Sequence, residues 1–198
     1  VTVLLLAMQN PVVVAENAAS LDWITDGRYV LGVGLGYRPE EFEALGVDFK
    51  QRVSRFEEAI PLIRRLWTED SVTHHGTHFN VGGLGASIKP KRVGGPPIWV
   101  GGDVLAAVKR AARLNCPWIA PPTMTFREIA ERVKVYRETI SKIDGGNVSE
   151  QPIVREVAIG ATKQEALEVA GPALLAKYES YASWGQTATK EQGRLADN

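Results

Sequence analysis

The sequence predicts an α/β fold in which parallel strands form one sheet and helices cover its faces. Five short apolar runs alternate with stretches of helical periodicity, and such alternation is typical of a parallel sheet. A glycine-rich turn follows two of these runs, at residues 32–36 and 101–102. Glycine lets a ligand approach the backbone closely, and the N–H groups that open a helix favour an anion. The two turns therefore predict a phosphate-bearing ligand across the strand ends.

The predicted strands are residues 1–7, 29–34, 98–101, 118–120 and 153–159. Parallel strands carry their carboxyl ends to the same side of a sheet. We therefore expect Ala7, Leu35, Gly102 and Pro121 to lie on one side of the molecule.

Five helices are predicted around these strands. Residues 11–24 and 51–67 repeat apolar side chains at the spacing of one helix face. A further helix is expected to open at Asp103, directly after the second glycine turn. The stretches 125–143 and 162–181 each begin with Thr and have Glu three positions later, which is the capping-box pattern of a helix start.

Residues 71–96 interrupt the alternation of strands and helices. Residues 72–81 predict an extended hairpin with its turn at Gly76, and a glycine-rich basic loop follows. We interpret this segment as an insertion between a helix and the next strand. One domain is expected over residues 1–185, and the polar residues 186–198 are expected to form a flexible tail. The sequence begins without Met inside a predicted strand, which suggests further sequence upstream.

The composition excludes several classes of protein. A chain of 198 residues suffices for one domain with a sizeable core. The 23 Lys and Arg residues balance the 23 Asp and Glu residues, which argues against a nucleic-acid or anionic-membrane partner. The single Cys116 allows no intrachain disulfide and indicates a cytoplasmic location, and we expect it to be a small buried residue rather than a nucleophile. No segment predicts a signal peptide or a membrane span.

The first glycine turn permits two interpretations. Gly32, Gly34 and Gly36 follow the spacing G-x-G-x-G, which differs from the dinucleotide fingerprint G-x-G-x-x-G. No acidic residue follows at the end of a second strand about twenty residues later, where a ribose ligand is expected. The alternative is that Gly32 and Gly34 relieve crowding inside a barrel.

The polar candidates are few. His74, His75 and His78 lie on the predicted hairpin with no carboxylate nearby in sequence, which favours solvated histidines over metal ligands, so no metal site is predicted. Asp103 is the strongest polar candidate at the second turn. The alternative for Asp103 is a carboxylate that is stabilised by the dipole of the helix that follows.

Two further pairs of residues have structural interpretations that we favour. Trp99 and Trp118, near strand ends, could stack on an aromatic ligand, but core packing is the more common role. Asp22 and Arg28 flank a turn from helix to strand, where an ion pair is expected rather than catalysis.

The sequence resembles the luciferase-like monooxygenases, the bacterial luciferase superfamily of flavin- and deazaflavin-dependent enzymes, over about residues 1–185. The motifs that carry the resemblance are Asn10-Pro11, Leu21-Asp22, Gly27-Arg28, residues 31–36, Glu41-Phe42, residues 45–47, Arg52, residues 55–57, Leu66-Trp67, residues 96–102, residues 110–113 and Trp118-Ile119. The resemblance implies a TIM (β/α)8 barrel with its cofactor at the carboxyl ends of the strands. It implies an incomplete barrel, with about five of eight strands, which are the third to the seventh.

The resemblance also implies a cofactor, either reduced FMN or a deazaflavin coenzyme. A cis peptide beneath the flavin ring in the family matches Thr2–Val3, and phosphate contacts match the turns after the fourth and fifth strands. A catalytic histidine found in some members has no counterpart here, so no catalytic residue is assigned. The implied cofactor-binding residues are Thr2, Val3, Leu35, Gly36, Gly101, Gly102, Asp103, Val104 and Ala107.

The function that the resemblance implies is that of a flavin-dependent oxidoreductase or monooxygenase. As a flavoprotein it would act on paired donors with O2 and oxidise a small organic substrate. The cofactor would supply the redox chemistry. One alternative is a non-catalytic truncated barrel that binds flavin or serves as a scaffold subunit. A second is an unrelated phosphate-binding barrel enzyme, such as a lyase or isomerase of sugar phosphates.

The expected partners are a small-molecule substrate, a flavin reductase and a second copy of the chain. Members of the family commonly form dimers through helices on one flank of the barrel, which implies a homodimer. We expect helices 12–24 and 51–67 at the interface, and the alternative is that both helices cover their own strands. The residues that suggest the interface are Ala15, Ala18, Ala19, Phe56, Ile60 and Trp67.

Overall fold

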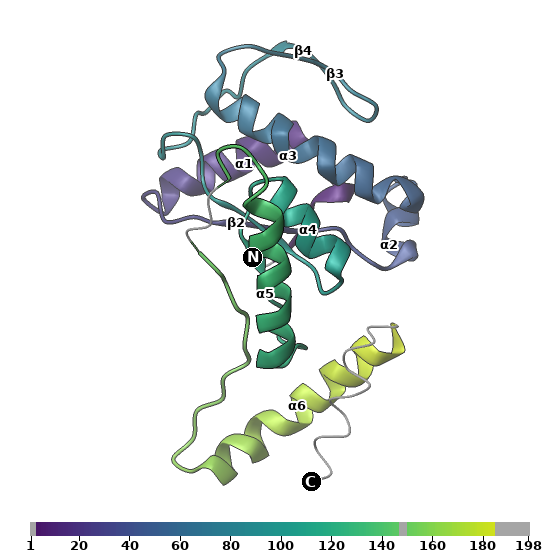
Figure 1. Cartoon of the computed structure of the whole chain (residues 1–198), viewed down its shortest axis with the longest axis vertical. Coiled ribbons are helices and arrows are strands. Elements are labelled where there is room, and N and C mark those ends of the chain that lie inside the picture. The colour runs from purple at the N-terminus through teal and green to yellow at the C-terminus, as the bar shows by residue number, and fades with distance from the viewer. Residues whose placement is uncertain (1–2, 147–149, 185–198) are drawn as a thin grey trace.

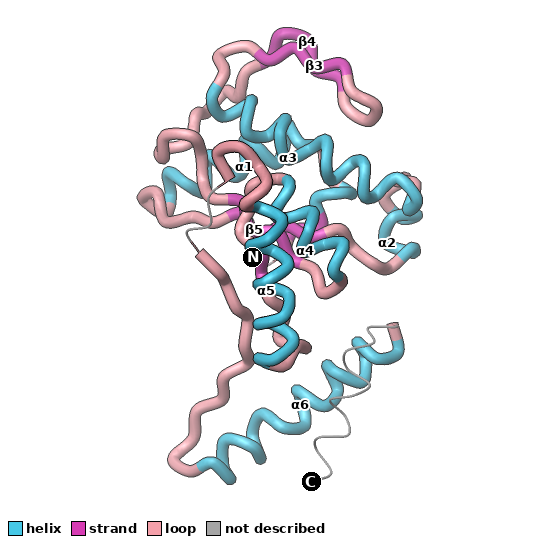
Figure 2. The backbone as a smooth tube through the Cα atoms, in the orientation of Figure 1, coloured by secondary structure: helices cyan, strands magenta, loops and turns pink. Residues whose placement is uncertain are grey.

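The computed structural model describes residues 3–146 and 150–184 of the chain. A parallel sheet of four strands, in the order β1-β2-β5-β6, lies among helices (Figures 1 and 2). The strands are β1 (Leu4–Leu5), β2 (Leu31–Gly34), β5 (Ile98–Gly101) and β6 (Trp118–Ile119). This arrangement is the predicted α/β class with a parallel sheet.

Two predicted strands differ from the observed ones. The stretch 153–159 forms only one bridge, between Ile153 and Ala120, and Val157 and Ile159 are 82% and 92% exposed. A strand needs a neighbour along its whole length, and after the hydrogen bond from Val154 to the carbonyl of Ala120 this stretch has no further backbone partner in the described part of the chain. The first predicted strand is shorter than expected, because residues 6–8 close into the 3-10 turn η1 (Leu6–Met8).

The helices form where the local chemistry predicts them. In α1, Asn10 caps the first turn by accepting a hydrogen bond from the N–H of Val12 at 2.9 Å. In α5, Thr125 and Glu128 make both hydrogen bonds of the capping box. The helices are α1 (Pro11–Ile24), α2 (Pro39–Ala44), α3 (Arg52–Thr68), α4 (Leu105–Arg113), α5 (Phe126–Ile140) and α6 (Lys163–Ser183). The short α2 and the 3-10 turn η2 (Phe49–Gln51) were not predicted.

Helices pair on the outside of the sheet, with α1 on α3 and α4 on α5. The small and aromatic side chains that suggested a dimer interface lie inside this packing. Ala15, Ala18 and Ala19 on α1, and Phe56 and Ile60 on α3, are at most 1% exposed. Trp67 is also buried, and its indole N–H donates to the carbonyl of Ala15 at 2.9 Å. These side chains are therefore not available to a partner. Their burial agrees with the alternative, in which both helices cover their own strands.

The segment between α3 and β5 contains the predicted hairpin, as β3 (Val72–His75) and β4 (Asn80–Leu84). Its turn is held against α3 by Glu58, which accepts hydrogen bonds from the N–H groups of His78 and Phe79, both at 3.0 Å. Glu58 also bonds to Nε2 of His74 at 2.9 Å, and His78 bonds to the Ser54 hydroxyl at 2.8 Å. The prediction of a solvated histidine is therefore wrong for His74, because a carboxylate distant in sequence reaches the hairpin, whereas the His78 side chain keeps an exposed contact with Ser54.

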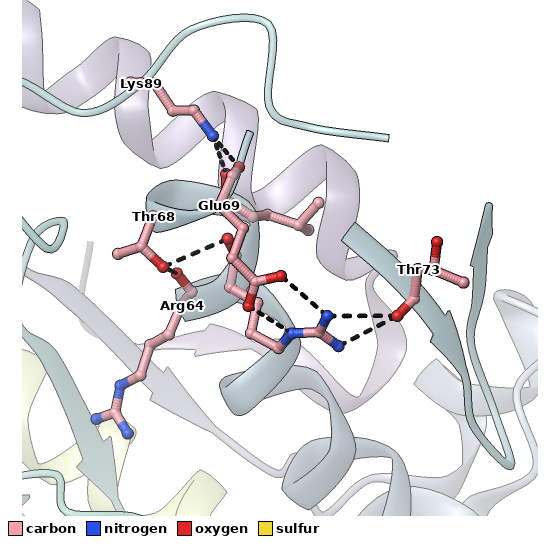
Figure 3. A network of polar contacts seen from close by, with 7 residues as sticks. Arg64, Thr68, Glu69, Thr73 and Lys89 are labelled. Atoms are coloured by element: carbon pink, nitrogen blue, oxygen red, sulfur yellow. Dashed lines mark hydrogen bonds and ion pairs between the residues drawn. The ribbon is translucent and has the colours of Figure 1, made fainter. Parts of the chain in front are cut away.

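Basic side chains tie the loop after the hairpin to the helices. Figure 3 shows Lys89, whose ammonium group donates to the carbonyls of Leu66, at 3.0 Å, and Glu69 at the end of α3. In the same network, Arg65 pairs with the Glu69 carboxylate through two hydrogen bonds of 2.7 and 2.9 Å, and also donates to the Thr73 carbonyl. Cations near the last carbonyls stabilise a helix end, so these contacts fix the end of α3.

A buried carboxylate on α1 holds the same loop from the other side. Asp22 is fully buried and accepts a hydrogen bond from the N–H of Arg92 at 2.8 Å. The Arg92 guanidinium lies 3.8 Å from the second oxygen of Asp22. The expected ion pair of Asp22 with Arg28 is therefore wrong, since Arg28 instead donates to the carbonyl of Thr25. The partner of Asp22 lies seventy residues away in the sequence, where no local pattern points to it.

Most of the last helix, α6, lies away from the sheet and from the other helices (Figure 1). It lies beyond the end of the sheet at which α5 begins, and none of its residues is buried. The expected tail at residues 186–198 lies outside the described residues. Among the described residues, no helix is long and apolar enough to cross a membrane.

Candidate functional site

The parallel register brings the expected strand ends to one edge of the sheet. Leu5 pairs with Gly34, Val33 with Val100 and Gly101 with Ile119, so all four strands end at the same side. Beyond these ends lie η1, the turn at Leu35 and Gly36, the turn at Gly102, and the loop that begins at Pro121. We call this side the carboxyl edge. In TIM barrels the corresponding face carries the active site.

Val3 fills a space that two glycines leave open just below the carboxyl edge. A Cβ atom built on Gly34 would lie 2.9 Å from Cγ2 of Val3, and one built on Gly101 would lie 3.2 Å from Cγ1. Both positions must therefore stay small for the Val3 side chain to fit, which supports the crowding interpretation for Gly34. We call this apolar surface, formed by the Val3 isopropyl group and the bare backbones of Gly34 and Gly101, the Val3 floor.

The turn after β2 requires glycine for a second reason. Gly36 has φ of +82°, which L side chains rarely adopt, and a Cβ there would lie 2.9 Å from the Met8 methyl group and 3.1 Å from the Phe42 ring. The close approach packs this turn against η1 and α2. Leu35 is partly buried against the core and offers no polar side chain.

The turn after β5 is fixed by hydrogen bonds to its carbonyl groups. Trp118 donates its indole N–H to the carbonyl of Gly102 at 2.7 Å, and Arg132 donates to that of Asp103 at 2.9 Å. A Cβ on Gly102 would lie 2.5 Å from the Cβ of Ala107, so glycine is needed for α4 to pack this close to β5. Larger side chains at position 102 would therefore disturb the fold as well as block a ligand.

The first turn of α4 leaves donors without partners. Its N-cap residue, Val104, makes no side-chain capping bond in the described part of the chain. The N–H groups of Leu105 and Ala106 have no acceptor within the helix, because the first four N–H groups of any α-helix lack one. These groups and the positive end of the helix dipole favour an anion at the carboxyl edge.

Asp103 does not open α4, as the sequence suggested. The helix begins at Leu105, so the Asp103 carboxylate lies before the N-cap and its main-chain carbonyl is held by Arg132. The prediction of a helix opening at Asp103 is therefore wrong by two residues. Ala107 is buried against Gly102, and Val104 is 59% exposed, so neither side chain adds a polar group.

Arg132 is a basic residue at this edge that the sequence analysis missed. It belongs to α5, which packs directly on α4, and its guanidinium is partly buried beside the turn. A signal was present in the sequence, because Arg132 shares the helix face of the buried residues Ile129 and Tyr136. A cation on an otherwise apolar face needs a partner, and the partner here is the turn after β5.

The loop after β6 is held in a similar way. Arg155 donates to the carbonyl of Pro121 at 3.1 Å and to that of Met124 at 2.9 Å, and its guanidinium lies 4.9 Å from the centre of the Phe126 ring. Phe126 is 72% exposed and Leu105 is 50% exposed, so the rim of the carboxyl edge is largely apolar. Among the described residues no group of His, Cys, Asp or Glu side chains could hold a metal ion.

The remaining candidates have structural positions. Trp118 is fully buried and serves both the core and the turn after β5, whereas the Trp99 indole N–H is buried without a partner in the described part of the chain. Cys116 is buried, and burial raises the pKa of its thiol, although the nearby Arg64 opposes that rise. A raised pKa leaves little thiolate and argues against a nucleophile. Thr2 lies outside the described residues.

A cavity of about 300 Å³ lies at the opposite, amino edge of the sheet. Pro97, just before β5, and Pro117, just before β6, line it together with Trp67 and Arg64. The Arg64 guanidinium is already bonded to the carbonyls of Leu114 and Asn115. The free helix N–H groups and the glycine turns all lie at the other edge, so the carboxyl edge is the candidate site.

Comparisons with known proteins identify the family and the fold of the chain. Residues 1–198 match the sequence profile of the luciferase-like monooxygenase family. An uncharacterized protein of Mycobacterium tuberculosis (strain ATCC 25618 / H37Rv) is 37% identical over 143 residues, which are 71% of this chain and 48% of that protein. The chain spans about half the length of the curated relatives it matches.

Solved structures match the fold over almost the whole chain. Monooxygenase RslO1 from Streptomyces bottropensis gives a TM-score of 0.80 at 25% identity, over 98% of this chain and 59% of that one. The FMN complex of the oxygenating constituent of 3,6-diketocamphane monooxygenase from Pseudomonas putida gives 0.78 at 19% identity, over 97% and 59%. An F420-dependent secondary alcohol dehydrogenase gives 0.67 at 21% identity, over 81% and 49%. The parallel sheet therefore corresponds to part of a TIM barrel, as predicted.

Proposed function

We propose that this chain, which belongs to the luciferase-like monooxygenase family, binds a flavin or deazaflavin cofactor at its carboxyl edge and serves the oxidation or reduction of a small organic substrate. The observation that carries the proposal is the juxtaposition of two features at one edge. The first turn of α4 offers free N–H groups beside Arg132, and the Val3 floor lies next to that turn.

The turn after β5 suits the phosphate of such a cofactor. The N–H groups of Leu105 and Ala106 would donate to phosphate oxygens, and the Arg132 guanidinium would supply positive charge. The hydrogen bonds from Trp118 and Arg132 hold the turn in place before any ligand arrives. The Asp103 carboxylate opposes an anion unless it turns outward, so phosphate binding rests on the backbone and on Arg132.

The Val3 floor suits a planar ring system. Gly34 and Gly101 present no side chain there, so a ring would lie against the Val3 isopropyl group and bare backbone. A bound reduced flavin supplies electrons for oxygen chemistry, and a deazaflavin supplies a hydride. The work left to this chain is to bind, orient and keep water away from the cofactor, and an apolar rim serves that purpose.

Structural neighbours do not decide between the two cofactors. One neighbour was solved with FMN, and another carries an F420–acetone adduct. Titration of this chain with FMN and with F420 decides the choice by their dissociation constants. The family match excludes the unrelated sugar-phosphate barrel enzyme.

A non-catalytic flavin-binding subunit is the second candidate. The observation that favours it is the lack of polar side chains where the family offers hydroxyl groups, since Leu35, Val104 and Ala107 are all apolar. A chain that binds FMN but oxidises no organic substrate when reduced FMN and O2 are both supplied would support this candidate over the enzyme.

The test of the proposal is an FMN titration of the parent chain and of an Arg132→Gln variant. Loss of a charge-assisted hydrogen bond costs about 1.5–3 kcal/mol, so we expect affinity to fall by about ten- to a hundredfold. Arg127→Gln is the matched control, because Arg127 lies on the same helix with a side chain that is 90% exposed. Equal losses of FMN affinity in both variants, or no loss in Arg132→Gln, would show that the phosphate does not bind at this turn.

We also propose a cytoplasmic homodimer that receives reduced flavin from a flavin reductase when FMN is the cofactor. The buried free cysteine suits a reducing compartment. The dimer would use the outer face of α1, where Val13 is 55% exposed, Leu21 39% and Ile24 77%. Exposed apolar side chains that gather on one helix face favour burial against a partner. Light scattering at micromolar concentration should give twice the chain mass, and a monodisperse monomer would contradict the dimer.

A further inference from the structure

Four aromatic rings converge at the mouth of the carboxyl edge from two distant segments. Tyr37 directly follows the Gly36 turn, whereas Tyr178, Tyr181 and Trp184 lie at the end of α6 and just after it. The centre of the Trp184 ring lies 6.3 Å from that of Tyr37 and 6.0 Å from that of Tyr181. The rings of Tyr178 and Tyr181 meet edge to face at 6.2 Å. We call these four residues the aromatic cluster.

The aromatic cluster is not part of the hydrophobic core. Tyr37 is 42% exposed, Trp184 is 43% exposed, and α6 has no buried residue. Figure 1 shows α6 crossing beyond the carboxyl edge, so its end meets the β2–α2 turn on the side where the cofactor is proposed to bind. Arg38 lies over one face of the Trp184 ring, so a ligand would meet the exposed remainder of Trp184 and of Tyr37.

Two ion pairs flank the aromatic cluster. Arg38 lies over the Trp184 ring, at 4.9 Å from its centre, and forms an ion pair with Glu41 at 3.4 Å. Lys177 lies 5.5 Å from the centre of the Tyr181 ring and pairs with Glu156 at 2.6 Å. Burial and the hydrogen bond to Glu156 raise the pKa of Tyr178 to about 12, although the nearby Arg155 opposes that rise, so its phenol stays neutral. Tyr37 and Trp184 themselves carry no charge, so the rings suit a ligand without one.

We propose that Tyr37 and Trp184 bind the ring of a neutral, planar organic substrate at the mouth of the carboxyl edge. The inference rests on the proposed function for its position relative to the cofactor, and it adds the substrate class. Ring faces stack on flat ligands and gain little from a flexible aliphatic chain. The two residues are therefore specificity-determining contacts for ring-bearing substrates.

The experiment measures binding of 2-naphthol to the chain by calorimetry, with octan-1-ol as an aliphatic probe. The parent chain should bind 2-naphthol more tightly than octan-1-ol. Trp184→Ala should weaken 2-naphthol binding by about three- to tenfold, the range expected for one aromatic contact, and Trp184→Phe should restore most of it. Trp23→Ala is the matched control, because Trp23 is 55% exposed on α1, and its 2-naphthol affinity should equal that of the parent.

A second variant tests the other segment and guards against a disturbed α6. Tyr37→Ala leaves the sequence of α6 unchanged and should also weaken 2-naphthol binding. The double variant should lose less binding free energy than the sum of the two single losses. Unchanged 2-naphthol affinity in both single variants, or equal affinity of the parent for the two probes, would overturn the proposal. An FMN titration of the same parent sample separates the two hypotheses. FMN binding without a Trp184 effect refutes the aromatic cluster, whereas a Trp184 effect without FMN or F420 binding refutes the proposed function.

Discussion

At the scale of single residues, glycines shape the candidate site by what they leave out. Gly34 and Gly101 leave room for Val3, and Gly102 lets Ala107 come close to the end of β5. Sequence alone pointed to these glycines, but it could not decide between a ligand and a neighbouring side chain as their reason. Arg132 escaped the sequence analysis because its role depends on how α5 packs on α4.

Substitutions test whether Val3 fills the space that Gly34 leaves open below the carboxyl edge. Gly34→Ala should lower the free energy of unfolding by about 1–3 kcal/mol, because the new methyl group meets Val3 at 2.9 Å. In the Val3→Ala background the same change should cost much less, since the clashing methyl group is gone. Urea unfolding measures both effects. Gly82→Ala is the control, with no atom within 4 Å of the new group, and a Gly34 cost that is independent of Val3 would contradict the Val3 floor.

At the scale of elements, the helices were predicted better than the strands. Helices depend on adjacent residues, whereas strands depend on neighbours that are distant in the sequence. The helix α1 was predicted from the spacing of its apolar residues, and α5 from its capping box and its apolar face, which are all local patterns. The stretch 153–159 carries equally clear strand character but pairs only at Ile153, because pairing depends on a neighbour that the local pattern does not reveal. The hairpin was predicted, whereas its attachment to α3 through Glu58 depends on residues 16 to 21 positions apart.

Glu58 should make the stability of the hairpin depend on pH. Burial raises the pKa of Glu58, but hydrogen bonds from His74 and from the N–H groups of His78 and Phe79 outweigh burial and lower it overall. A lowered pKa in the folded state means that Glu58 stabilises the fold above its unfolded pKa of about 4.5, and that this contribution is lost as the pH falls through the folded value.

The corresponding variant is Glu58→Gln, which should lower the free energy of unfolding at pH 7 by about 1–3 kcal/mol. Its stability should also change less than that of the parent chain between pH 5 and acid, as followed by urea unfolding at each pH. Glu131→Gln, with a 60% exposed side chain, should stay within about 0.5 kcal/mol of the parent chain. Parallel pH curves for parent and Glu58→Gln would show that Glu58 does not hold the hairpin.

At the scale of the whole molecule, the parallel sheet gives the chain two unlike ends. The amino edge has a cavity of about 300 Å³, but in the described part of the chain no helix begins there, and Arg64 beside the cavity is already bonded. The carboxyl edge has the glycine turns, the start of α4 and the aromatic cluster. The fold class followed from the alternation of strands and helices, and the location of the candidate site followed from the direction of the strands. The proposed substrate contacts depend on how the end of α6 meets the β2–α2 turn. No local sequence pattern indicates that contact.

The central claim is that a flavin or deazaflavin binds at the carboxyl edge, and amide chemical-shift mapping tests it most directly. A 15N-labelled sample of the chain is titrated with FMN and, separately, with F420, and the backbone N–H signals are followed by NMR. We predict the largest shifts at Leu105 and Ala106, with further shifts at Gly36 and Gly101. Shifts confined to Gly95 and Asn115 at the amino-edge cavity, or no shifts with either cofactor, would contradict the claim.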